Sequence, residues 1–135
     1  MLRPITDQSL VVRTDFSDQR AWRELCAAIS QPVGGFRACV EFYSDPALDG
    51  FDAARLVAEV APDSRSFLFV ADRHTLEHPE HPVLVIDLFE EPGRTFRVVP
   101  SEMWAVENNL SIANLDFAEF ADAVDADGVF RGFPR

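Results

Sequence analysis

Three histidines form the part of this sequence whose residue types best suit metal chemistry. They lie within eight positions of one another and have acidic residues on both sides. Imidazole and carboxylate groups are the ligands that zinc and related divalent ions prefer, and a bound metal can activate water as a nucleophile. One hypothesis is therefore a small metal-dependent enzyme, whose divalent metal is held by Asp72, His74, His78 and His81.

Two prolines favour a simpler interpretation of the same segment. Both His78 and His81 precede a proline, and a residue in that position is biased away from the helical region. We therefore expect residues 72–82 to form an extended or turned polar loop at the rim of a sheet. We favour this loop over a metal site.

Asp15 and Asp72 offer a related alternative, because each follows a predicted strand. Ligands bind at the carboxyl ends of strands in open α/β sheets, so the two carboxylates could share a cation or divide acid and base roles. Asp15 is also placed to cap the first helix, and Asp72 is placed to begin a turn. We favour the structural role.

Trp104 lies close to three asparagines, and this combination could line a pocket for a polar ligand. The favoured interpretation is again structural. We expect Trp104 to fill the core, while Asn108, Asn109 and Asn114 end one helix and cap the next.

The signatures of several common enzyme classes are missing from the sequence. It contains no G-x-S-x-G, no glycine-rich dinucleotide or phosphate loop and no H-E-x-x-H. All twelve basic residues are arginines, which excludes Schiff-base chemistry on a lysine. A non-enzymatic function is therefore favoured over an enzymatic one.

The strongest functional signal is an acidic block near the carboxyl end of the chain. Between Glu102 and Phe130 there are seven carboxylates and no positive charge, in a protein with a formal net charge of -11. Apolar residues run through the block, so we expect it to fold. A folded surface of one sign repels nucleic acid and anionic membranes and attracts basic partners.

We therefore expect a protein–protein interaction module that binds a basic protein, for example an immunity or antitoxin-like protein that neutralises a basic toxin. A homo-oligomeric component joined through its Phe-rich carboxyl end is a further alternative. No cofactor is expected apart from the metal of the enzymatic alternative. The expected partner-binding residues are Glu119, Asp122, Asp125, Phe130, Arg131 and Phe133.

Length and cysteine content indicate the general class of protein. A chain of 135 residues is the usual size of one domain. No apolar stretch approaches the thickness of a bilayer, and the first residues contain no apolar leader, so we expect a soluble cytoplasmic protein. Cys26 and Cys39 lie in apolar runs without metal-binding or redox spacing, and we expect two buried, reduced thiols.

Apolar periodicity predicts alternating strands and helices. Stripes of apolar residues at helical spacing predict helices that end near Ser30 and Val60. The run 67–70 is the most apolar, so we expect it at the centre of the sheet, covered on both faces. Asp116 and Glu119 form a capping signal for the last helix.

These elements predict an α/β fold: one domain over residues 1–135, built as a sandwich of a mixed β-sheet of about five strands and packed helices. The segments 83–89 and 95–99 are expected to pair in antiparallel fashion across a turn. The expected strands are 10–14, 37–43, 67–70, 83–89 and 95–99, with a short edge strand in 129–133.

Several segments also resemble a family of small actinobacterial proteins that is known as a domain of unknown function. The similarity spans nearly the whole chain. It implies an actinobacterial, cytoplasmic, single-domain protein, and it supplies neither an activity nor catalytic residues. The segments that carry it are 12–16, 78–82, 96–104, 106–111, 116–117, 120–121 and 127–133.

Overall fold

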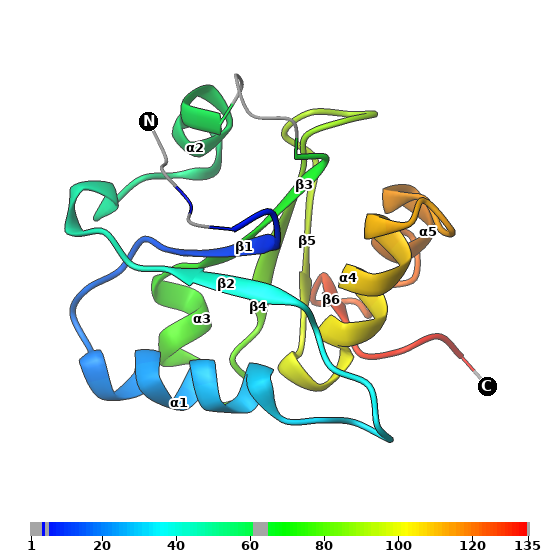
Figure 1. Ribbon diagram of the computed structural model, residues 1–135, viewed down its shortest axis with the longest axis horizontal. Helices are drawn as coiled ribbons and strands as arrows, with labels where there is room; N and C mark the ends of the chain where they lie inside the picture. Colours follow the sequence, from blue (N-terminus) through cyan, green and yellow to red (C-terminus); the bar gives the residue numbers. More distant parts are fainter. Residues whose placement is uncertain (1–3, 5, 61–64, 135) are drawn as a thin grey trace.

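Six strands form one mixed sheet at the centre of the protein (Figure 1). The computed structural model describes residues 4, 6–60 and 65–134. The strands are β1 (Ser9–Arg13), β2 (Val40–Tyr43), β3 (Phe67–Ala71), β4 (Val83–Asp87), β5 (Thr95–Val98) and β6 (Val129–Phe130). Their order across the sheet is β2-β1-β3-β4-β5-β6.

Strand β4 runs against all the others. β1 pairs in parallel with β2 and β3, β5 pairs in parallel with β6, and β4 is antiparallel to β3 and β5. The carboxyl ends of five strands therefore lie along one end of the sheet, which we call the carboxyl end. The opposite end, where β3 begins and β4 finishes, is the amino end.

Helices cover both faces of the sheet unequally. Buried residues of α1, α3, α4 and α5 share one hydrophobic core with one face of the sheet, whereas α2 and η1 pack on the other face. Figure 1 shows α2 apart from the remaining helices. The helices are α1 (Gln19–Ser30), η1 (Pro46–Leu48), α2 (Ala53–Val60), α3 (Arg73–Glu77), η2 (Pro100–Glu102), α4 (Met103–Ser111) and α5 (Phe117–Ala121).

The predicted α/β class and mixed sheet are confirmed. β3 is central, and all five of its residues are buried because both faces are covered. The hairpin of β4 and β5 is antiparallel as expected. The sheet has six strands, since Val129 and Phe130 pair with β5 as the predicted edge strand.

The prediction of a loop over residues 72–82 was wrong in its first half, which forms α3. Asp72 and Thr75 make a reciprocal capping box at the start of this helix. The helix ends at Glu77, and the next residue, His78, has the extended φ and ψ expected for a residue before proline. The proline rule therefore described the end of the helix, while the capping pair decided its start.

The two cysteines differ in burial. Cys26 is half-buried, whereas Cys39 is exposed, so the expectation of two buried thiols was wrong for Cys39. Both are free thiols. Burial raises the pKa of Cys26 to about 11, and the nearby charge of Arg13 offsets only part of this effect.

An ion pair between Asp72 and Arg97 joins the segments at the carboxyl end of the sheet. The two guanidinium nitrogens of Arg97 lie 3.0 and 2.7 Å from the two oxygens of Asp72. Arg97 also donates to the carbonyl of Pro82, 3.1 Å away, and the buried hydroxyl of Thr75 donates to the same carbonyl. One side chain from β5 thus holds the start of α3 and the start of β4.

Hydrogen bonds lower the pKa of the Asp72 carboxyl. Burial alone would raise the pKa of this carboxyl, but hydrogen bonds from Arg97 and Thr75 and the charge of Arg97 outweigh burial and lower the pKa below its ordinary value. The ion pair is about three-quarters buried, with side-chain exposures of 21% for Arg97 and 27% for Asp72. It is therefore shielded from much of the screening that weakens surface pairs.

The turn after α4 has the hydrogen bonds of a Schellman motif. The N–H of Ala113 donates to the carbonyl of Leu110, and the N–H of Asn114 donates to that of Asn109. This motif places its central residue in the left-handed region, where Ala113 has a φ of 54°. Glycine is the usual residue there because a side chain adds strain.

We expect Asp72→Asn to lower the free energy of unfolding by about 2 kcal/mol at neutral pH, because it leaves Arg97 without its counter-charge. The folded pKa of Asp72 lies below the unfolded value of about 3.9. The contribution is therefore present above the unfolded pKa and is lost as pH falls through the folded pKa. Urea unfolding from neutral pH to about pH 2 should show the two proteins converge. A constant difference in stability would contradict this, and Asp52→Asn is a surface control.

We expect Ala113→Gly to raise the free energy of unfolding by about 1 kcal/mol, because glycine removes the strain of the left-handed position. Ala105→Gly provides the matched control. It lies inside α4, where the same change costs about 1 kcal/mol. Chemical denaturation of both variants measures the two effects, and a loss of stability in both would contradict the assignment of the Schellman motif.

Candidate functional site

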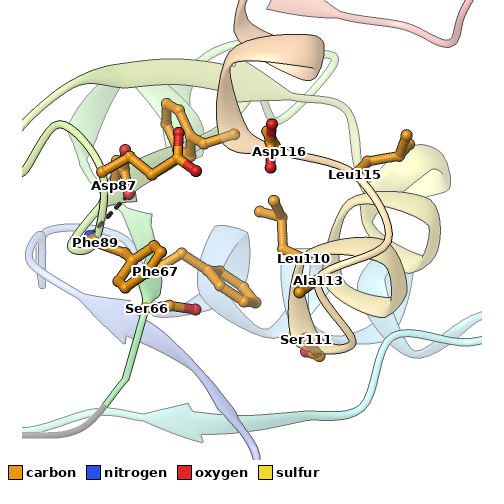
Figure 2. Close-up of a pocket in the computed structure, with 11 residues that line it drawn as sticks. Ser66, Phe67, Asp87, Phe89, Leu110, Ser111, Ala113, Leu115 and Asp116 are labelled. Atoms are coloured by element: carbon orange, nitrogen blue, oxygen red, sulfur yellow. Dashed lines mark hydrogen bonds between the residues drawn. The ribbon is translucent and has the colours of Figure 1, made fainter.

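A pocket opens at the amino end of the sheet, between the β4–β5 turn and the turn that joins α4 to α5 (Figure 2). Its volume is about 260 Å³. Phe67 and Asp87, which contribute to it, are directly paired residues of β3 and β4. Their side chains therefore point to the same face of the sheet, toward the two helices.

The wall of the pocket is mainly apolar. Phe67 and Phe117 are each 5% exposed, and Leu110 and Leu115 are half-buried. Phe89 is 74% exposed and borders the pocket from the β4–β5 turn. Figure 2 shows Asp87 and Phe89 on one side of the hollow and Leu110 and Leu115 on the other.

Three carboxylates accompany this apolar wall. Asp87 is only 3% exposed, whereas Glu90 and Asp116 are exposed. The two oxygens of Asp87 accept hydrogen bonds of 2.9 Å from the backbone N–H groups of Phe89 and Glu91. Asp87 thus fixes the turn that carries Phe89, and it places a carboxylate at the pocket.

The carboxylates of the pocket have no cationic partner among the described residues. The neighbouring arginines are directed elsewhere. Arg94 binds Glu91 and Asp122 at 3.0 and 2.8 Å. Arg65 donates to the backbone carbonyls of Thr6 and Gln8.

Glu107 is a further buried carboxylate, next to the pocket, and its role is structural. It is 5% exposed and accepts hydrogen bonds from Ser9, at the start of β1, and from the backbone of Cys39, before β2. Ser111, which lines the pocket, also donates to Glu107. Glu107 therefore ties α4 to two strands at the amino end of the sheet.

The predicted metal ligands do not form one site. Asp72 is occupied by Arg97 and Thr75, and the rings of His74 and His78 lie 5.5 Å apart on α3 and at its end. The Nδ1 atom of His81 lies 3.0 Å from the carbonyl oxygen of Thr75. Within residues 4, 6–60 and 65–134, no three His, Cys, Asp or Glu side chains are grouped in a way that could hold a metal ion.

The predicted partner-binding residues divide into two groups. Phe130, expected at the rim, is instead fully buried, because β6 lies under α5 and its ring packs against Phe120 at 5.2 Å. Phe133 is 46% exposed and contacts both of these rings. Of the two predicted aromatic anchors, only Phe133 is therefore accessible to a partner.

The charged members of that prediction are largely engaged within the chain. Arg131 makes ion pairs with Glu80, Asp125 and Asp127 at 2.7–2.8 Å. Asp122 pairs with Arg94, and Glu119 accepts the backbone N–H of Asp116 as its capping partner. Asp116 is the member of the acidic block that lines the pocket, and it has no ion pair among the described residues. The sequence did not single out this pocket.

The remaining polar candidates take the expected structural roles only in part. Asp15 does not cap α1, whose N-cap residue is Asp18, and Asn114 does not cap α5, whose N-cap residue is Asp116. Asp15 accepts hydrogen bonds from Ser17 in the turn before α1. Asn109 and Asn114 bond to each other at the end of α4. The expectation that Trp104 fills the core was wrong: it is half-buried and stacks on exposed Phe36 with ring centroids 4.7 Å apart.

No helix in the described part of the chain combines the length and the apolar character needed to cross a membrane. A search among curated proteins finds no relative of this chain. A family model described as a domain of unknown function (DUF6924) matches residues 8–133. The chain therefore belongs to this family, whose domain accounts for almost its entire length.

Proposed function

We propose that this protein is a non-enzymatic interaction module that binds a basic protein partner, with the pocket beside Phe89 at the centre of the contact. The observation that carries the proposal is the set of carboxylates at the pocket, Asp87, Glu90 and Asp116, which lack ion pairs among the described residues. A cationic group of a partner would supply the missing charge.

The environment of the pocket supports this function. Apolar walls exclude water and lower the local dielectric, so that a charge interaction there is stronger than on an open surface. Phe89, which is 74% exposed and borders the pocket, adds apolar area beside the charges. Buried aromatic and apolar anchors surrounded by charge are typical of protein interfaces.

The whole-protein charge favours the same kind of partner. A formal net charge of -11 attracts basic proteins over long distances and raises their rate of association. An immunity or antitoxin-like protein that neutralises a basic toxin is one form of this function. The proposal includes a cytoplasmic location, which the two free thiols support.

We expect a tagged protein to capture a basic partner from lysate of its native host at low salt and to lose it at high salt, because exposed charges are screened. The double variant Glu90→Gln with Asp116→Asn should weaken binding of that partner about tenfold, equivalent to about 1.4 kcal/mol. Mass spectrometry identifies the partner, and binding assays with the purified proteins give the affinity.

Asp52→Asn provides the matched control. Asp52 also stands at the start of a helix, where its oxygen accepts the N–H of Arg55, and asparagine caps helices as well as aspartate does. This variant changes one charge on the opposite face of the sheet and should bind as wild type does. An acidic partner, or equal binding by all variants, would contradict the proposal.

A further inference from the structure

The size of the pocket indicates what can enter it. Its volume of about 260 Å³ lies just below the range of about 300–1,000 Å³ that is typical of sites for small-molecule ligands and cofactors. A single long side chain is a better match for such a space than a nucleotide or an organic cofactor. Phe89 borders the same space (Figure 2).

The carboxylates surround this space at different depths. Asp87 is buried and held by two backbone N–H groups, while Asp116 is exposed across the hollow (Figure 2). Each oxygen of Asp87 accepts one backbone hydrogen bond and retains a second lone pair. An entering group with several donors in a fixed plane could therefore bond to carboxylates on more than one side.

The aromatic lining distinguishes between the two basic side chains. A guanidinium is more weakly hydrated than an ammonium and stacks on aromatic faces, and the pocket offers Phe67 and Phe117. The same pairing occurs elsewhere in this protein, where the guanidinium carbon of Arg55 lies 3.9 Å from the centre of the Phe51 ring. The methylene stem of an arginine would lie against the leucines of the wall.

We propose that the pocket beside Phe89 receives one arginine side chain of the partner protein, and that the residue next to this arginine is apolar and packs on Phe89. This inference rests on the proposed function and adds the chemical identity of the anchoring residue. The guanidinium pairs with Asp87, Glu90 and Asp116, and the neighbouring apolar residue covers Phe89, whose side chain is 74% exposed.

The test uses the full chain and the peptide acetyl-Ala-Leu-Arg-Leu-Ala-amide, followed by amide chemical shifts in an NMR titration. The backbone N–H groups of Phe89 and Glu91 bond to Asp87, so they report directly on that carboxylate. We expect these two amides and that of Ala113 to shift. The analogue with citrulline in place of arginine, which keeps the shape and removes the charge, should bind at least about tenfold more weakly.

Variants locate the interaction. Glu90→Gln with Asp116→Asn should abolish the shifts, and Asp52→Asn should leave them unchanged. A lysine peptide that binds as tightly as the arginine peptide would overturn the assignment of arginine. Equal affinity for n-butylguanidinium alone would indicate a free organic cation instead of a protein side chain and would also overturn it.

Two further outcomes separate this inference from the proposed function. If the full chain captures a basic partner in a salt-dependent manner but the peptide leaves the pocket amides unmoved, the arginine anchor is wrong and the interaction function stands. If the peptide binds at the pocket and no basic partner is captured, the anchor stands and the function is wrong. A dimer in light scattering that the arginine peptide dissociates would identify the occupant as a second copy of this chain and overturn the proposed partner.

Discussion

The shortage of positive charge is the constraint on which the arrangement of this protein depends, because twelve arginines face 23 acidic residues. Several of these arginines join segments that are far apart in the sequence. Arg97 connects β5 to the start of α3, and Arg131 connects the end of β6 to Glu80 and to Asp125 and Asp127. These bridges neutralise carboxylates at the carboxyl end of the sheet, whereas the three carboxylates of the pocket at the amino end have no such bridge among the described residues.

The pocket exists because two local turns hold its opposite sides. Asp87 bonds to the backbone of Phe89 and Glu91 and thereby fixes the β4–β5 turn. The Schellman motif around Ala113 fixes the turn after α4. Neither turn depends on a ligand for its hydrogen bonds. A preformed site of this kind loses little conformational entropy on binding, so more of the interaction energy appears as affinity.

Local sequence patterns predicted the sheet and most helices, because apolar periodicity directly reports which face is buried. The capping pair of Asp116 and Glu119 likewise predicted the start of α5. Helix α3 was missed because its capping partner is Thr75, a residue without the acidic side chain of the usual signal.

The pocket was missed for a different reason: Asp87 and Asp116 come together only through the packing of α4 and α5 on β3 and β4, which no local pattern describes. Phe130 was misplaced because its burial depends on the same packing.

Burial of Asp87 links the pocket to the stability of the hairpin. Asp87 is 3% exposed, and the hydrogen bonds from the backbone N–H groups of Phe89 and Glu91 compensate for its lost hydration. A guanidinium at the pocket would add a charged partner to a carboxylate that already holds the turn in place. The bound guanidinium and the β4–β5 turn would then stabilise each other. A ligand that binds only the folded form of the turn shifts the folding equilibrium toward that form. Asp87 therefore both holds the turn beside the pocket and would be stabilised by an incoming cation.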